Sequence, residues 1–66
     1  MIVVIRAGEY KRKIWSDERP VPEVGDIVEI VKDNKKVLVK KRRWVAESVS
    51  AAGVTLWKVI LYGEFV

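Results

Sequence analysis

The side chains of this sequence that could do chemistry are basic, and they fall into two short runs. Residues 11–13 form the first run and residues 40–43 the second, with a tryptophan close behind each. Cations bind backbone phosphates and flat indole rings stack on bases, so this pattern predicts a nucleic-acid-binding surface. The candidate site residues are Lys11, Arg12, Lys13, Trp15, Lys40, Lys41, Arg42, Arg43 and Trp44.

Charge is segregated along the chain. Residues 1–15 sum to +3, residues 16–34 to −4, residues 35–45 to +6 and residues 46–66 to −1, which gives the net charge of +4. The isoelectric point near 9.6 is typical of nucleic-acid-binding domains. The basic runs also fit a second interpretation, in which lysines protect a sheet edge from pairing or meet the acidic stretch 17–26 across the surface.

The sequence argues against catalysis. It has no histidine, the commonest general base and zinc ligand, and no cysteine for disulfides or thiolate sites. The adjacent acids Asp17 and Glu18 would point apart on extended backbone, and the scattered glycines form no phosphate-binding loop. We therefore expect no enzyme activity, no cofactor, no metal site and no small-molecule substrate.

Hydropathy predicts a cytoplasmic protein. The longest apolar run, Met1–Ile5, is far shorter than the roughly 20 residues that span a membrane, and it lacks the flanks of a secretory signal. Glutamine is absent, and a third of the residues are charged, a composition typical of thermophile proteins.

The composition predicts an all-β fold. Valine and isoleucine make up 19 of the 66 residues, against four alanines and three leucines. The length supports a single domain over residues 1–66, and a compact fold of this mass exposes roughly 4,300 Å².

About five short antiparallel strands are expected, closing into a small barrel. Residues 1–15 form either a hairpin or one kinked strand. The loop 16–25 contains Pro20 and Pro22; it is either a rigid crossover whose turn Asp17 caps or a loop that binds a protein partner. The expected strands are Met1–Arg6, Tyr10–Trp15, Asp26–Lys32, Lys36 to at least Val45, and Val54–Tyr62, with turns at 33–34 and 50–53 and a short tail at 63–66.

A four-residue loop at 50–53 would pair Val49 with Val54 and place Trp44 opposite Val59. This register puts Trp44 and Trp57 on the core face. Trp15, at a strand end before a polar loop, is the tryptophan expected at the surface.

Carried backwards, the same register would point Lys40 and Arg42 into the core, where unpaired cations are costly. A β-bulge is therefore predicted within residues 40–43, and it would turn Val37 and Val39 inward. If strands 10–15 and 36–45 are neighbours, their cations form one basic stripe.

One segment resembles a known group of folds. Pro22-Glu23-Val24-Gly25-Asp26-Ile27-Val28-Glu29-Ile30, a tight turn, and Val37-Leu38-Val39-Lys40 together resemble the Gly-Asp-x-Val hairpin of SH3-like small barrels, which include KOW and Tudor-type modules. The resemblance covers residues 20–40 and implies a fold alone. The chain lacks the aromatic cage of methyl-lysine readers, and Asp33-Asn34 stands where KOW modules have a glycine.

A different function also fits the sequence. Apolar side chains lie opposite the predicted core face at Val54, Leu56 and Ile60, and the tail adds Phe65 and Val66. Such surplus apolar surface is typical of chains that bind a protein partner or a second copy of themselves. The alternative is therefore a protein-interaction or assembly module, possible as a homo-oligomer, that binds no nucleic acid.

Overall fold

A computed structural model of the chain describes residues 2–15, 20–49, 51–53 and 55–66, without the side chains of residues 15, 48 and 49. The fold within these ranges is all-β. The elements are β1 (Ile2–Ala7), β2 (Tyr10–Trp15), β3 (Ile27–Ile30), a single 3₁₀ turn η1 (Val31–Asp33), β4 (Lys35–Val49) and β5 (Thr55–Phe65). The expected all-β class is therefore confirmed, and β5 runs through most of the segment that the sequence predicts as a tail.

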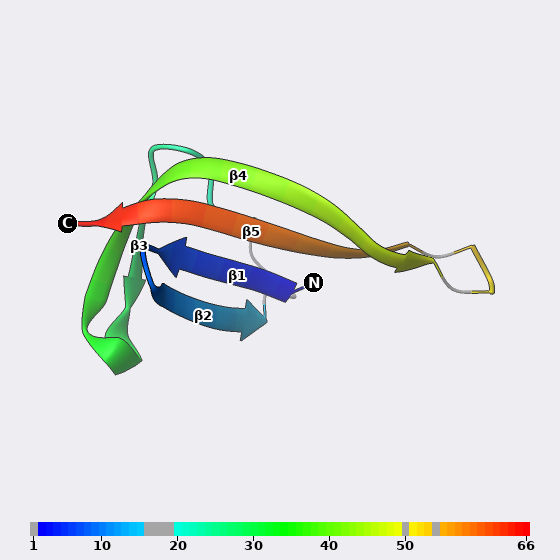
Figure 1. Cartoon of the computed structure of the whole chain (residues 1–66), viewed down its shortest axis with the longest axis horizontal. Coiled ribbons are helices and arrows are strands. Elements are labelled where there is room, and N and C mark those ends of the chain that lie inside the picture. Colours follow the sequence, from blue (N-terminus) through cyan, green and yellow to red (C-terminus); the bar gives the residue numbers. More distant parts are fainter. Residues whose placement is uncertain (1, 16–19, 50, 54) are drawn as a thin grey trace.

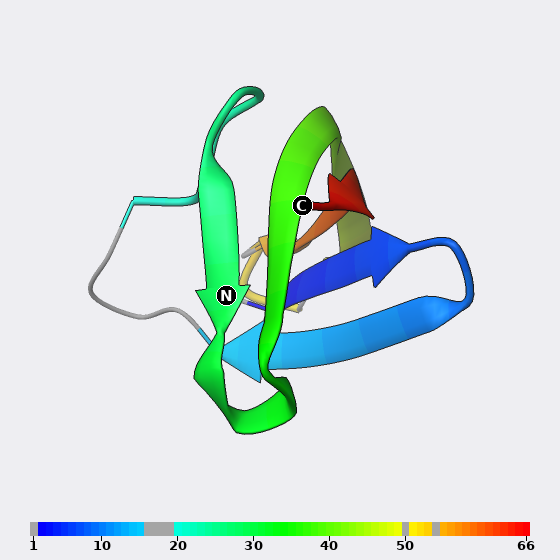
Figure 2. The same ribbon diagram turned by 90° about the vertical axis from the view of Figure 1, so that its left-hand side faces the viewer.

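The strands form one sheet in the order β2-β1-β5-β4-β3, and it curls strongly into a half-barrel (Figures 1 and 2). β1 and β2 make a hairpin, which settles the alternative that the sequence leaves open. The expectation of purely antiparallel strands is wrong, because β1 pairs with β5 in parallel. The chain reaches this pairing only after β3 and β4 have been laid down, so no local sequence signal announces it.

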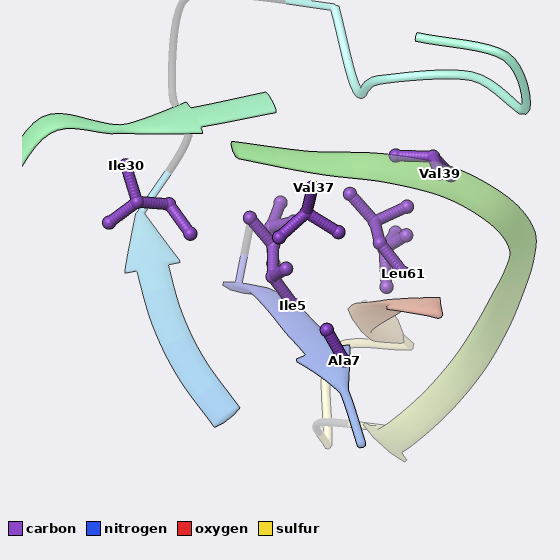
Figure 3. Packing of buried hydrophobic residues seen from close by; sticks show 8 residues of the cluster. Ile5, Ala7, Ile30, Val37, Val39 and Leu61 are labelled. Carbon is purple, nitrogen blue, oxygen red and sulfur yellow. The ribbon is translucent and has the colours of Figure 1, made fainter. Parts of the chain in front are cut away.

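The core fills the inside of the curl, here called the inner face. Its most deeply buried side chains are Ile5, Val37, Val39, Val59 and Leu61, which come from three strands (Figure 3). Each alternates with a neighbour on the opposite, outer face, as the pleat of a strand requires. Burial of these branched residues from strands distant in sequence is what holds the curl together.

The predicted β-bulge is present. The register between β4 and β5 shifts between Val39 and Lys41, so Lys40 is the extra residue. Val37 and Val39 consequently face the core, with almost no exposed surface. The strands approach so closely here that a Cβ on Gly63 would collide with the Leu38 carbonyl oxygen and the Val37 side chain. The absence of a side chain at Gly63 therefore permits the bend.

The second half of β4 and the start of β5 project beyond the core (Figure 1). β1 pairs with β5 only over Lys58–Tyr62, and β3 pairs with β4 only over Lys35–Leu38. The molecule measures 42 × 21 × 20 Å. It exposes 5018 Å², about 700 Å² more than the roughly 4,300 Å² expected for a compact chain of this mass.

The two edge strands of the half-barrel are linked through η1. The Tyr10 hydroxyl donates a 2.6 Å hydrogen bond to the Asp33 carboxylate, and the Arg12 guanidinium lies 3.6 Å from the same oxygen. The Tyr10 ring also packs edge-on against Phe65, with the ring centroids 5.5 Å apart. These contacts fasten β2 to the turn after β3 and to the end of β5. Asn34 then takes the left-handed conformation expected of this turn, with φ of 53°.

Candidate nucleic-acid interface

The outer face of the sheet brings together cations from four strands. Arg6 on β1 is the register partner of Lys11 on β2 and of Tyr62 on β5, and Tyr62 is in turn the partner of Lys41 on β4. Register partners share a face, so these four side chains form one row across the sheet.

A second row runs parallel to the first. Its members are Lys13, Val4, Ile60 and Arg43. Lys58 follows in a third row, between Ile2 and Val45. The cations of these rows are called the basic face below: Arg6, Lys11, Lys13, Lys41, Arg43 and Lys58.

Five of these six cations are exposed and make no ion pair with another residue that the structure describes. The sixth, Lys58, is half-buried and lies 4.0 Å from Glu47. Acids stand only at the margins of the face: Glu47 lies beside the third row, and Glu64 lies on β5 opposite Leu38. The middle of the face therefore has uncompensated positive charge available to an anion.

Tyr62 sits among these cations as an aromatic spacer. The guanidinium carbon of Arg6 and the ammonium of Lys41 each lie 6.0 Å from the centre of its ring. Cations at this distance are attracted to the ring quadrupole. Tyr62 therefore restrains Arg6 and Lys41, although Coulomb repulsion would otherwise drive the two charges apart.

The floor of the basic face is apolar and hollowed. Val4 is only 3% exposed although it points away from the core, because the stems of surrounding long side chains cover it. A cavity of about 140 Å³ lies above it, lined by Ile2, Val4, Lys11, Lys13, Glu47 and Lys58. Three of its six lining residues are lysines, which suits a phosphate group.

The structure divides the cations predicted from the sequence between the two faces of the sheet. Lys11, Lys13, Lys41 and Arg43 are on the outer face, and Lys40 is exposed at the bulge. The condition for a continuous stripe, that β2 neighbours β4, is not met, because β1 and β5 lie between them. The outer face nonetheless unites the cations of β2 and β4, because the intervening strands add Arg6 and Lys58.

Two predicted site residues lie on the inner face instead. Arg12 is engaged by Asp33, and Arg42 donates a long hydrogen bond of 3.4 Å to the Pro22 carbonyl. Strand alternation explains both positions, since each falls between two outward-facing cations. Sequence reasoning overlooked Arg6, Lys58 and Tyr62. Alternation along each strand could have grouped Lys58 with Tyr62, but only the sheet order places them beside Lys11.

The expectation that Trp44 and Trp57 lie in the core is wrong. They are 46% and 47% exposed, and their rings pack edge-to-face with centroids 6.2 Å apart. Both have the inward parity that the sequence predicts, and Trp44 does pair with Val59. Exposure follows because the projecting hairpin carries this part of the inner face beyond its neighbours. The predicted exposure of Trp15 concerns a side chain outside the described part of the structure.

The loop before β3 is organised by its own hydrogen bonds. Asp26 accepts a 2.8 Å bond from the Glu23 amide, and its own amide donates to the Glu23 carbonyl at 3.1 Å. Asp26 therefore closes this turn. The turn-capping role predicted for Asp17 falls outside the described residues. A shallow hollow of about 470 Å³ is lined by Pro20, Val21, Pro22, Glu23, Asp26, Ile27 and Val28.

Within the described ranges, no cluster of three acidic side chains is placed to hold a metal ion. No helix in the same ranges is long and apolar enough to cross a membrane. Comparison with known proteins finds no match among family models, curated proteins or solved structures. The functional argument accordingly rests on the geometry of this chain.

Proposed function

We propose that this chain is a small nucleic-acid-binding module that grips backbone phosphates with its basic face, largely without sequence specificity. The observation that carries the proposal is the convergence of cations from four strands on one face, with acids only at its margins. Five exposed cations free of described ion pairs match the requirement for displacing counterions from a phosphate backbone.

The chemistry of the face favours contacts with the backbone over reading of base edges. Its exposed polar groups are mainly ammonium and guanidinium ions, which bind phosphate oxygens as charges. The amide side chains that recognise adenine edges are absent there, since the chain has no glutamine and its single asparagine, Asn34, follows η1. Binding should therefore depend strongly on salt and weakly on sequence.

The curled sheet is compatible with the SH3-like barrels that residues 20–40 resemble, and we include that assignment in the proposal. Small barrels of this kind present a sheet face or its flanking loops to their ligands. Their architecture does not select a ligand by itself. The charge on the outer face is what favours nucleic acid here.

The test is binding of end-labelled single-stranded and duplex DNA and RNA, measured by fluorescence anisotropy at about 50 mM salt. The proposal expects binding to at least one of these polymers and weakening as salt is added. Absence of binding to all of them at low salt would refute it. A variant with Lys11 and Lys13 both changed to Ser should bind more weakly at unchanged thermal stability, because both side chains are exposed.

The alternative function, an assembly module, also has structural support. Leu56, Phe65 and Val66 are 58%, 48% and 64% exposed. The outer edges of β2 and β3 have no neighbouring strand in the sheet. Sedimentation equilibrium at several protein concentrations tests this function, and a mass of 7.6 kDa at every concentration would argue against self-association.

A further inference from the structure

The surface that the basic face leaves unexplained is the projecting part of the inner face. Trp44 and Trp57 there each expose nearly half of their surface, whereas tryptophans in soluble domains are usually well buried. Aromatic rings exposed as a packed pair are typical of binding surfaces, where one end of the ring system meets a ligand.

The pair is held rather than loosely displayed. Trp57 lies opposite Ala46, and Trp44 opposite Val59, so the rings meet diagonally across the two strands. Their planes are 86° apart, and the Arg42 guanidinium lies 5.7 Å from the centre of the Trp44 ring. Each ring is thus braced by a neighbour, which reduces the conformational entropy lost when a ligand stacks on it.

The position of the pair relative to the cations suggests its ligand. β3 pairs with β4 only as far as Leu38, so no described strand covers the outer edge of β4 at residues 41–46. Lys41 and Arg43 project from one side of this bare edge, and Arg42 and Trp44 from the other. A strand of nucleic acid lying along the edge can meet cations with its phosphates and indole rings with its bases.

We infer that the Trp44–Trp57 pair is a base-stacking platform and that the preferred ligand is a single strand. This inference rests on the proposed phosphate binding and adds the class of nucleic acid. A duplex keeps its base faces inside the stack, where the rings cannot reach them, whereas an unpaired strand offers them. The positive charge flanking the rings favours this polyanion over a neutral peptide.

The test compares affinities for a short oligothymidine, an abasic strand of equal length and a duplex of equal length. Stacking of one base contributes about a 5- to 150-fold gain in affinity. The wild-type protein should therefore bind oligothymidine at least about 5-fold more tightly than the abasic strand, which carries the same phosphates. This comparison needs no variant and cannot be confused with misfolding.

Variants then assign the effect to the rings. Trp44→Leu and Trp57→Leu should each reduce the preference for oligothymidine over the abasic strand. Leu56→Ala is the matched control, because Leu56 is equally exposed on the adjacent residue but points to the opposite face. Quenching of tryptophan emission by oligothymidine should likewise fall in the double variant, where Trp15 remains as a reference.

The two proposals fail in distinguishable ways. Absence of binding to every polymer would refute phosphate binding, and the inference would fall with it. Equal affinity for oligothymidine, abasic strand and duplex would leave phosphate binding intact and overturn the stacking platform. Self-association that disappears in the tryptophan variants while nucleic-acid binding persists unchanged would also overturn it, since the rings would then pack against a second copy.

Discussion

Removal of two outer-face cations from β4 gives the sharpest test of the basic face. Lys41 and Arg43 are both exposed and lie one row apart at the margin of that face. Replacing both with Ser removes two charges and keeps residues that a strand accepts. The double variant should fold with wild-type stability, because neither residue forms an ion pair with a described carboxylate.

The magnitude follows from the number of exposed cations. With five phosphate contacts, the logarithm of the affinity for a single strand should fall with the logarithm of salt with a slope of about −3.5. Between 50 and 200 mM salt this is a loss of about 100-fold. The double variant retains three contacts, so its slope should be about −2.1. For a duplex the corresponding slopes are about −4.5 and −2.7.

The assay is a titration of labelled oligonucleotide by anisotropy at four salt concentrations. The matched control replaces Lys32 and Lys36 with Ser, which removes the same charge from exposed positions near Asp33 and Glu29. Its slope should remain at the wild-type value. An unchanged slope in the Lys41/Arg43 variant, or an equal reduction in the control, would show that net charge and not the basic face governs binding.

Three further predictions concern the fold. Gly63→Ala should lower the free energy of unfolding by about 1–3 kcal/mol in urea, because its Cβ has no space against β4, whereas Glu64→Ala beside it should have little effect. Leu61→Ala should cost about 2–5 kcal/mol in the same assay, and a smaller loss would contradict its place in the core. The hydrogen bond to Asp33 and burial raise the pKa of Tyr10 above 10.0. Its neutral form is therefore favoured in the fold, and the stability it contributes should be complete below pH 10.0 and be lost as pH rises through the raised pKa. Thermal melts between about pH 8 and 11 should show this alkaline loss in wild type and a smaller one in Tyr10→Phe; equal losses would exclude Tyr10 as the cause.

Local sequence determined a large part of the fold. The excess of valine and isoleucine specifies strands, and the cost of burying a cation correctly located the bulge at Lys40. The pairing of Trp44 with Val59 was also predicted, although the loop is longer than expected. Val49 pairs with Thr55, and a second irregularity between Ala46 and Ser48 restores the register.

Tertiary structure alone decided which surfaces are buried and which are joined. Alternation assigns a side chain to a face, but burial depends on whether another element covers that face. Trp57 has the same parity as the buried Val59 and is nevertheless exposed, because β1 begins its pairing with β5 at Lys58. The basic face likewise exists only because β1 inserts between β2 and β5. That parallel contact joins residues more than fifty positions apart, a distance over which no sequence periodicity carries information.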